Sequence, residues 1–427
     1  MNEQPGLLRR VWDTVRQPSV PAARAADHVV ELCDALLSER GEVSSARIAS
    51  EAIAAYRDLN DSGRGAFFSK LAERFPADPV DVDRAIDAYR TDPSPARAAD
   101  LHLASEPRRQ ELFRRLNTAA GGTATLVQMR ADLLTTLQEH PDRAAIDADL
   151  VHLFRSWFNR GFLTLQRIDW RTSALILERL IQYEAVHQIQ DWNDLHRRLE
   201  ADRRCYAFFH PSLPDEPLIF IEAALTRGLA SAVQPLIDVD APIADPARAD
   251  SAIFYSITNC QAGLRGVSFG NFLIKQAVED LRREFPRIRT FATLSPLPGF
   301  TAWLRSSPAG VRIPEDIRAA AARGAPAEGQ QRALLTLAAY YLLHARQGAL
   351  PLDRVARFHL ANGARIERLN WMGDSSEHGL QQSLGITVNY VYRLADVERH
   401  HEAYARRGAI AASHELHALA AAARRRP

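Results

Sequence analysis

A change in hydrophobic periodicity near residue 200 constrains the fold of this chain more than any other feature. Before that point, apolar residues recur at helical spacing, as in residues 28–37 and 174–181, which is typical of helices with one buried face. Breaks with proline or glycine, each followed by a new amphipathic stretch, fall at residues 76–79, 93–95, 121–122 and 141. Asp142 and Asp147 stand near two restarts and are expected to cap helices. Residues 1–200 are therefore predicted to form a helical bundle.

From about residue 203 the pattern changes to short apolar runs that are rich in β-branched or aromatic residues. The runs expected to be strands cover residues 205–210, 217–225, 252–258, 289–294, 364–371 and 386–393. Between the third and fourth runs stand a glycine-rich stretch, Asn259–Gly270, and an amphipathic helix, Asn271–Glu284, so this part forms a crossover unit. Residues 315–346 are expected to be a mostly helical insert. The prediction is an α+β multidomain chain in which residues 201–427 form an α/β domain with a mixed sheet.

The composition argues against several functional classes. A formal net charge of +1 gives no overall field that would attract nucleic acid or an anionic membrane. Cys33, Cys205 and Cys260 are far apart and form no metal-ligand or disulfide pattern, which favours a reducing compartment. No apolar run reaches the ~18 residues of a membrane span, and the N-terminal residues show no secretory apolar core. We expect a cytoplasmic protein without a structural metal.

The glycine-rich stretch is a candidate phosphate-binding loop. Gly263, Gly266 and Gly270 would let the backbone approach a pyrophosphate at the start of the following helix, and Arg265 adds a cation. The spacing is neither GxGxxG nor GxxxxGK[ST], so it supports neither a dinucleotide fold nor a P-loop. It is similar, in a relaxed form, to the loop of acetyl-CoA N-acyltransferase (GNAT-like) folds. Taken alone, it is also compatible with a turn that only packs a helix against a strand.

Longer motifs resemble the malonyl-CoA decarboxylase family in order and spacing. In the second half of the chain they are Ile253–Ile257, Gly263–Val267, Asn271–Lys275, Phe285-Pro286, Leu294–Phe300, Phe358–Ala364, Leu369–Met372 and Asn389-Tyr390. In the helical half they are Arg115–Asn117, Gly121–Thr123 and Met129–Leu133. The Leu-Ser-Pro-Leu-Pro-Gly-Phe and Phe-His-Leu-x-Asn-Gly-Ala motifs are the most specific, and together the matches cover most of the chain.

The resemblance implies a helical domain that contributes to a homo-oligomer, followed by a GNAT-like catalytic domain. It implies a catalytic pair at Ser295 and His359, acting on malonyl-CoA to yield acetyl-CoA and CO2. The implied substrate loop comprises Arg265, Gly266, Val267, Ser268, Phe269, Gly270 and Asn271, with Ser295 and His359 also in contact with the substrate. Many relatives carry glutamate where this chain has Ser268, and the consequence is open.

The chemistry of such a reaction suits these two residues. Loss of CO2 leaves an enolate at the thioester carbonyl, so the thioester is the electron sink and no cofactor or metal is expected. Ser295 follows a strand of the crossover unit, where open sheets bind ligands, and His359 can exchange a proton near neutral pH. Without the family motifs, the serine would indicate a turn and the histidine a buried core residue. Asn389 and Tyr392 could line the pocket, but we expect them to be strand residues.

Two other functions stay open at this point. The first is an acyltransferase with the same CoA loop, which would turn over only when an acceptor amine is added. The second is a non-catalytic scaffold that binds acyl-CoA without turnover, although Ser295 and His359 argue against it. The metabolic role and the size of the oligomer are open as well.

Overall fold

The computed structural model describes residues 22–267, 273–306, 308 and 310–424. These residues form two compact units. The first unit comprises the chain up to Phe162 together with Pro211–Leu213 and Gln261–Val267, and the second comprises the other described residues. The domain boundary that we expect near residue 200 stays a prediction.

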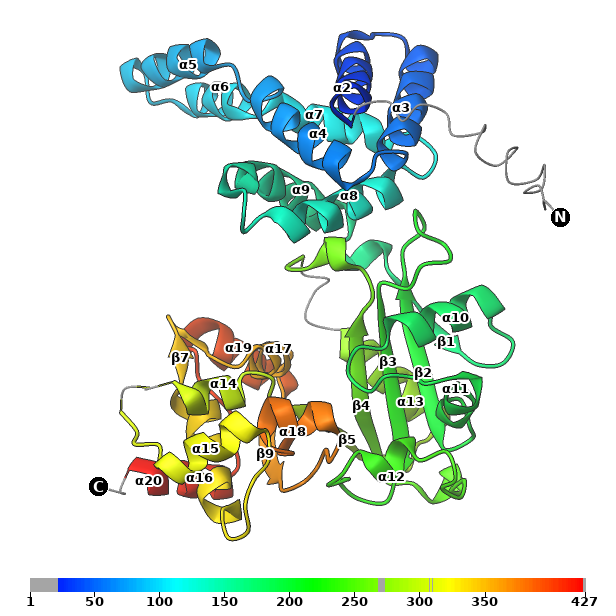
Figure 1. Cartoon of the computed structure of the whole chain (residues 1–427), viewed down its shortest axis with the longest axis vertical. Helices are drawn as coiled ribbons and strands as arrows, with labels where there is room; N and C mark the ends of the chain where they lie inside the picture. Colours follow the sequence, from blue (N-terminus) through cyan, green and yellow to red (C-terminus); the bar gives the residue numbers. More distant parts are fainter. Residues whose placement is uncertain (1–21, 268–272, 307, 309, 425–427) are drawn as a thin grey trace, which may run out of the picture. The chain divides into compact units, whose positions relative to one another are not determined.

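The first unit is built from helices, as the periodicity predicts (Figure 1). They are α2 (Ala22–Ser38), α3 (Glu42–Arg57), α4 (Asp61–Arg74), α5 (Pro79–Thr91), α6 (Pro95–Ser105), α7 (Arg108–Asn117), α8 (Gly122–Thr136) and α9 (Ala144–Trp157), with the short turns η1 (Pro141–Arg143), η2 (Arg160–Phe162) and η4 (Ala262–Leu264). The side chains of Asp78 and Ser94 cap α5 and α6, and a proline follows each cap. Proline is favourable there because the first helical N–H has no intrahelical partner. The proline breaks in the sequence are therefore helix starts.

The second unit contains the sheet and its covering helices. The strands are β1 (Thr164–Ile168), β2 (Arg203–Phe209), β3 (Ile219–Thr226), β4 (Ser251–Asn259), β5 (Thr290–Thr293), β6 (Ser295–Pro296), β7 (Arg346–Gln347), β8 (Leu350–Pro351), β9 (Arg365–Asn370) and β10 (Thr387–Tyr392). The helices are α10 (Ala174–Tyr183), α11 (Trp192–Arg198), α12 (Gln234–Ile237), α13 (Leu273–Glu284), α14 (Phe300–Arg305), α15 (Glu315–Arg323), α16 (Gln331–His344), α17 (Arg354–Ala361), α18 (Glu377–Ser383), α19 (Val397–Arg407) and α20 (His414–Arg424), with the turn η3 (Pro246–Arg248).

The sheet is mixed, as expected. Its strand order is β1-β2-β3-β4-β5-β10-β6, and β9 also pairs with β10. Neighbours are antiparallel except β4 and β5, which run parallel and are connected through α13. This is the expected crossover unit, and together with the helical first unit it confirms a helical N-terminal region followed by a domain with a mixed sheet.

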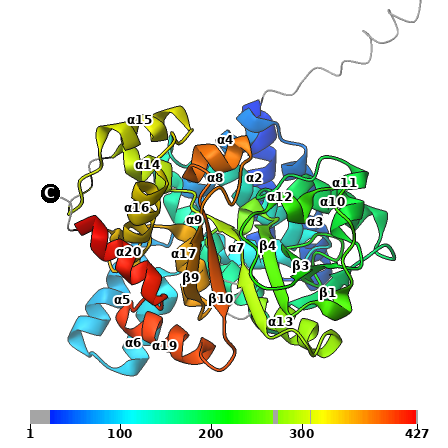
Figure 2. The same cartoon turned by 90° about the horizontal axis from the view of Figure 1, so that it is seen from below.

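The two faces of this sheet carry different helices, because successive residues of a strand point to opposite sides. On one face, Ile253, Ala292 and Val391 pack beneath α12. On the other face, Arg204 of β2 forms an ion pair with Glu284 of α13. Figure 2 shows α10, α11 and α12 on one side of β3 and β4, and α13 on the opposite side. We call these the α12 face and the α13 face.

One part of the predicted helical half belongs to the sheet. Thr164–Ile168 forms β1, which pairs antiparallel with β2. The helix α10 follows it and packs Ile176, Leu177 and Leu180 on the α12 face. Hydrophobic periodicity gives no signal for β1, because β1 is a five-residue edge strand in which only Ile168 is buried. Such a strand shows no alternation of apolar and polar residues.

Candidate active site

The structure places Ser295 and His359 in direct contact. Ser295 Oγ lies 3.0 Å from His359 Nε2, within the distance that a proton-transfer pair needs. Both residues are buried, with exposed fractions of 6% and 3%. The fold therefore brings together two residues that are 64 positions apart in sequence, although their catalytic role stays a prediction.

Local structure explains why both residues reach this point. Ser295 begins β6, where it pairs with Val388 of β10. His359 stands in the last turn of α17, a helix capped by the side chain of Asp353. The chain leaves α17 through Gly363, whose φ is +80° and where a Cβ atom would lie 2.2 Å from the carbonyl oxygen of Val397. Only glycine fits such a position, which gives the Asn-Gly of the Phe-His-Leu-Ala-Asn-Gly-Ala motif a structural role.

The surroundings of His359 keep its ring neutral. The ring stacks on Tyr390, with centroids 4.5 Å apart, and Nδ1 lies 2.7 Å from the hydroxyl of Tyr392. Burial without a partner of opposite charge lowers the pKa of His359 from its usual 6.5 to about 3. His359 is therefore an uncharged hydrogen-bonding group at neutral pH.

The hydrogen bonds define which ring nitrogen carries the proton. The hydroxyl of Ser295 donates to Thr293 Oγ1 over 2.8 Å. A hydroxyl has one hydrogen, so His359 Nε2–H must donate to Ser295 Oγ. The other ring nitrogen, Nδ1, then accepts from the hydroxyl of Tyr392. A continuous chain of donors thus runs from Tyr392 through His359 and Ser295 to Thr293.

Thr293 and Asn389 hold the serine end of this chain. Thr293 Oγ1 also accepts from the backbone N–H of Tyr390, at 3.3 Å. The amide of Asn389 donates to the carbonyl oxygen of Thr293 at 2.8 Å, and Asn370 donates to Asn389 Oδ1 at 3.0 Å. These buried polar groups are satisfied by one another, which stabilises a single arrangement.

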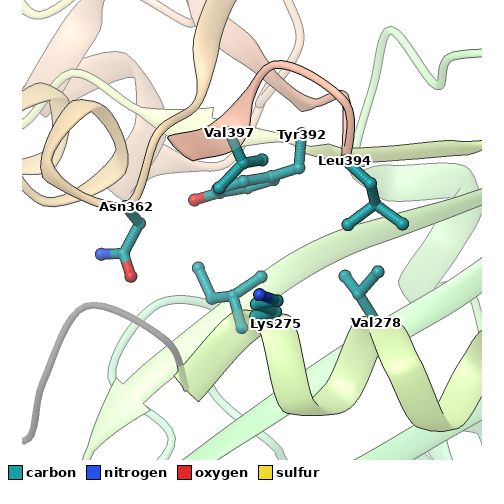
Figure 3. A pocket seen from close by; sticks show the side chains of 7 residues that line it. Lys275, Val278, Asn362, Tyr392, Leu394 and Val397 are labelled. Atoms are coloured by element: carbon teal, nitrogen blue, oxygen red, sulfur yellow. The ribbon is translucent and has the colours of Figure 1, made fainter. Parts of the chain in front are cut away.

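A narrow crevice lies beside Tyr392 on the α13 face. Figure 3 shows Lys275 and Val278 of α13 on one wall, and Asn362, Tyr392 and Val397 on the other. Its volume is about 10 Å³, which is room for one water molecule. Tyr392 belongs both to this wall and to the donor chain, so the crevice leads toward His359.

The predicted substrate loop is only partly described. Arg265 and Gly266 are exposed and Val267 is buried, and these three residues belong to the first unit. Ser268, Phe269, Gly270 and Asn271 lie outside the described residues. The structure therefore does not test whether the complete loop and the Ser/His pair act on one substrate.

A residue of α8 anchors the described part of the loop. Arg130, 3% exposed, donates to the carbonyl oxygens of Gly263 and Arg265 at 2.6 and 2.8 Å. Its Nε donates to Asp147 at 2.7 Å. The expectation that Asp142 and Asp147 cap helices is wrong, because Asp142 lies inside η1 and Asp147 lies in the first turn of α9, whose N-cap residue is Arg143. Gly263 is a packing residue, because a Cβ atom there would lie 1.8 Å from the carbonyl oxygen of Val127.

Sequence reasoning missed three contributors to these arrangements. Thr293 carries no sequence signal, Tyr392 is expected to be a strand residue that could line the pocket, and Arg130 stands out only as part of the Met129–Leu133 motif. A signal existed for Tyr392: it stands two residues after Tyr390 and so shares its face of β10. Arg130 could not be found from sequence, because the loop carbonyls that it bonds lie more than 130 positions away.

Two kinds of feature are absent from the described part of the chain. Among these residues, no group of three or more histidine, cysteine, aspartate or glutamate side chains is arranged to hold a metal ion. Within the same residues, every helix is too short or too polar to cross a membrane.

Comparisons with known proteins point to one family. The family model described as the malonyl-CoA decarboxylase C-terminal domain matches residues 161–426, and the model of the N-terminal domain of the same family matches residues 75–158. The chain is 35% identical to the mitochondrial malonyl-CoA decarboxylase of Mus musculus over 357 residues, which cover 75% of this chain and 73% of that protein.

Solved structures agree with the family models. The crystal structure of malonyl-CoA decarboxylase from Rhodopseudomonas palustris is 48% identical, covers 92% of this chain and 98% of that chain, and superposes with a TM-score of 0.86. The one from Agrobacterium vitis is 50% identical, covers 92% and 99%, and has a TM-score of 0.85.

Proposed function

Because the chain belongs to the malonyl-CoA decarboxylase family, we propose that Ser295 and His359 carry out the decarboxylation of malonyl-CoA to acetyl-CoA and CO2. The enzyme is a carboxy-lyase. The observation that supports this pair is the 3.0 Å contact between Ser295 Oγ and His359 Nε2 inside a buried donor chain. The acyltransferase and scaffold alternatives have no support from the family.

The reaction consumes one proton, and the pair supplies it. When the bond between the α-carbon and the carboxylate breaks, its electron pair moves to the thioester carbonyl and forms an enolate. The enolate collapses as the α-carbon takes a proton. His359 is neutral in the free enzyme, with a pKa lowered to about 3 by burial. A bound malonyl carboxylate favours the protonated ring, because an opposite charge nearby raises a histidine pKa, so substrate and proton enter together.

The donor chain defines how the proton reaches carbon. Because Nε2 already carries the hydrogen of the neutral ring, the added proton goes to Nδ1, and the hydrogen bond to the Tyr392 hydroxyl reverses its direction. Nε2 then gives its proton to Ser295 as the serine gives its own proton to the α-carbon, which returns the ring to its neutral form. The serine hydroxyl turns from Thr293 toward the acyl group when substrate binds. A buried site also removes water from around the carboxylate, which favours loss of CO2.

Single and double substitutions test the pair. Ser295→Ala and His359→Ala should each lower kcat by ~100-fold or more, the usual weight of a positioned proton-transfer group. The double variant should be no slower than the worse single one, since groups that act as a unit fail together. Binding of acetyl-CoA to both single variants serves as the control and should be nearly unchanged. A His359→Ala enzyme with near-normal turnover would remove this assignment and leave the family unaffected.

The substrate loop is proposed to hold the CoA phosphates with the backbone around Gly266 and the side chain of Arg265. Gly266 has a φ of +79° and open space around its α-carbon, so a side chain there strains the backbone without creating a clash. Gly266→Val should therefore raise KM for malonyl-CoA, and Arg265→Glu should raise it most at low salt, where charge contacts are least screened. An unchanged KM in both variants would exclude this loop.

The helical N-terminal part is proposed to contribute to a homo-oligomer. None of the residues of α5 and α6 is buried, and Val80 and Leu103 on these two helices are 66% and 68% exposed. A second copy of the chain would cover such side chains. Light scattering that gives the mass of one chain at micromolar concentration would reject this proposal.

A cytoplasmic location is proposed from the state of the cysteines. Cys33, Cys205 and Cys260 are buried and free, as expected in a reducing compartment. Cell fractionation that recovers the protein outside the cytoplasm would reject this proposal.

A further inference from the structure

The second unit holds a large cavity that the decarboxylation mechanism does not use. Its volume is about 640 Å³, within the range of roughly 300–1,000 Å³ that small-molecule sites occupy. One wall is the segment 181–190, which follows α10, and the facing wall is the segment 374–381, which includes α18. Gln234 and Ile237 of α12 complete the lining.

This cavity is distinct from the catalytic pair because it lies on the opposite face of the sheet. Its wall residue His187 packs against the ring of Tyr255, which belongs with Ile253 and Val391 to the α12 face. Thr293, which bonds Ser295, alternates in β5 with Ala292 of the α12 face and so points to the α13 face. The sheet therefore separates the two sites.

The lining of the cavity is acidic and rich in amides. Glu184, Asp374 and Glu377 contribute carboxylates, His187 and His378 contribute imidazoles, and the glutamines are Gln182, Gln188, Gln190, Gln234 and Gln381. Behind the lining, the charge of Arg198 also acts on His187, but its guanidinium is paired with Asp194 and Glu222. Although the chain has 53 lysines and arginines, none of them is among the described residues that line this cavity. Such a lining repels the phosphates of CoA and the carboxylate of malonate, and it attracts a cation.

His187 presents an unused acceptor in the wall. One ring nitrogen of His187 forms a hydrogen bond with the backbone of Tyr255. This hydrogen bond raises the pKa of His187, so the ring nitrogen is its donor. The other, Nε2, is buried without a hydrogen-bond partner among the described residues. Burial lowers the pKa of His187 to about 4, so Nε2 carries a lone pair at neutral pH. A buried acceptor without a donor costs ~1–3 kcal/mol, which a ligand N–H would recover.

Asp374 provides the matching charge. It is 4% exposed, and its carboxylate is close enough to stabilise a proton on His187. Its Oδ1 accepts from Gln234 Nε2 at 2.9 Å and from the backbone of Ser376 at 3.0 Å, which holds the carboxylate in place. Asp374 and His187 thus line the same cavity from two different segments of the chain, and the charge of the carboxylate reaches the imidazole.

We propose that this cavity is a binding site for a small primary amine, whose ammonium group donates to the carboxylate of Asp374 and to Nε2 of His187. The ammonium group has three N–H donors and a positive charge, so it can donate to both acceptors and neutralise the carboxylate. A hydroxyl group has one O–H donor and no charge, so it can do neither. The apolar side chains of Ile181, Val186 and Ile237 in the lining cover the methylene groups of the ligand.

Calorimetric titration of the full chain tests the proposal, with 1,4-diaminobutane as the probe and 1,4-butanediol as the uncharged comparison. The diamine should bind saturably with one site per chain, and the diol should bind at least ~10-fold more weakly. Asp374→Asn and His187→Phe should each weaken binding of the diamine by ~10-fold or more. The matched control is Asp280→Asn, which removes the same charge from α13 on the other face and should leave the affinity unchanged.

Several outcomes would overturn the assignment. The first is no saturable binding of the diamine to folded protein. The second is an affinity for the diol equal to that for the diamine. The third is an affinity for the diamine in both variants equal to that of the unchanged protein. Displacement of the diamine by acetyl-CoA would place it in the substrate cleft instead, so binding should persist at saturating acetyl-CoA and in Ser295→Ala. Circular dichroism checks that each variant is folded, and if one variant fails to fold the other carries the test.

Discussion

Removing the hydroxyl of Tyr392 tests the donor chain at its least obvious point. The hydroxyl lies 2.7 Å from Nδ1 of His359, and both residues are buried, at 4% and 3% exposed. In Tyr392→Phe the ring nitrogen becomes a buried acceptor without a donor, which costs ~1–3 kcal/mol. The proton can then move to Nδ1, and Nε2 would accept a hydrogen bond from Ser295 instead of donating one.

This cost reaches the rate by lowering the population of the Nε2–H tautomer that the mechanism uses. Since ~1.4 kcal/mol corresponds to a tenfold change, kcat should fall by roughly 10- to 100-fold. KM should change little, because the hydroxyl bonds the histidine rather than the nucleotide end of the substrate. The assay follows acetyl-CoA formation from malonyl-CoA at fixed pH, with unfolding measured in parallel to separate activity from stability.

The chain offers a matched control two residues earlier. Tyr390 stacks on the same imidazole, but its buried hydroxyl has no hydrogen-bond partner among the described residues. Tyr390→Phe keeps the stacked ring and should leave kcat within about twofold. Equal losses in the two variants would show that ring packing, not the hydrogen bond to Nδ1, matters. A Tyr392→Phe enzyme with full kcat would refute the donor chain.

Three further predictions follow from the same contacts. Gly363→Ala should lower the free energy of unfolding in urea by ~3 kcal/mol or more, because a positive φ combines with a clash against Val397. The control is Gly348→Ala, which should lower it by only ~1 kcal/mol, because Gly348 has a φ of +61° but open space around it. Arg130→Gln should raise KM for malonyl-CoA with kcat nearly unchanged, since it frees two loop carbonyls; an unchanged KM would contradict this role. Stability should decline as pH falls from about 6.5 toward 3, because His359 stays neutral when folded while the unfolded chain takes up a proton; urea unfolding at pH 5 and 7 should show a smaller decline in His359→Gln.

Local features of the sequence determined most of the architecture. Helical spacing, with prolines that begin α5 and α6, predicted the bundle, and apolar runs predicted β2, β3 and β4 within two residues of their ends. Such patterns are readable because each element must bury one face, whatever its partner is. The exception is β1, an exposed edge strand with a single buried residue, in which burial leaves no pattern.

Motifs also located the two residues of the proposed catalytic pair, but not the groups that act on them. The partners of His359, Tyr390 and Tyr392, are more than 30 positions away, and Arg130 bonds carbonyl oxygens of a loop 133 positions later. The cavity beside His187 and Asp374 left no trace in the sequence at all, because it exists only where two distant segments leave space between them. Hydrophobic periodicity records which face of an element is buried. Only the tertiary structure decides which polar groups meet there, since a hydrogen bond depends on distance and angle between atoms that the chain order does not relate.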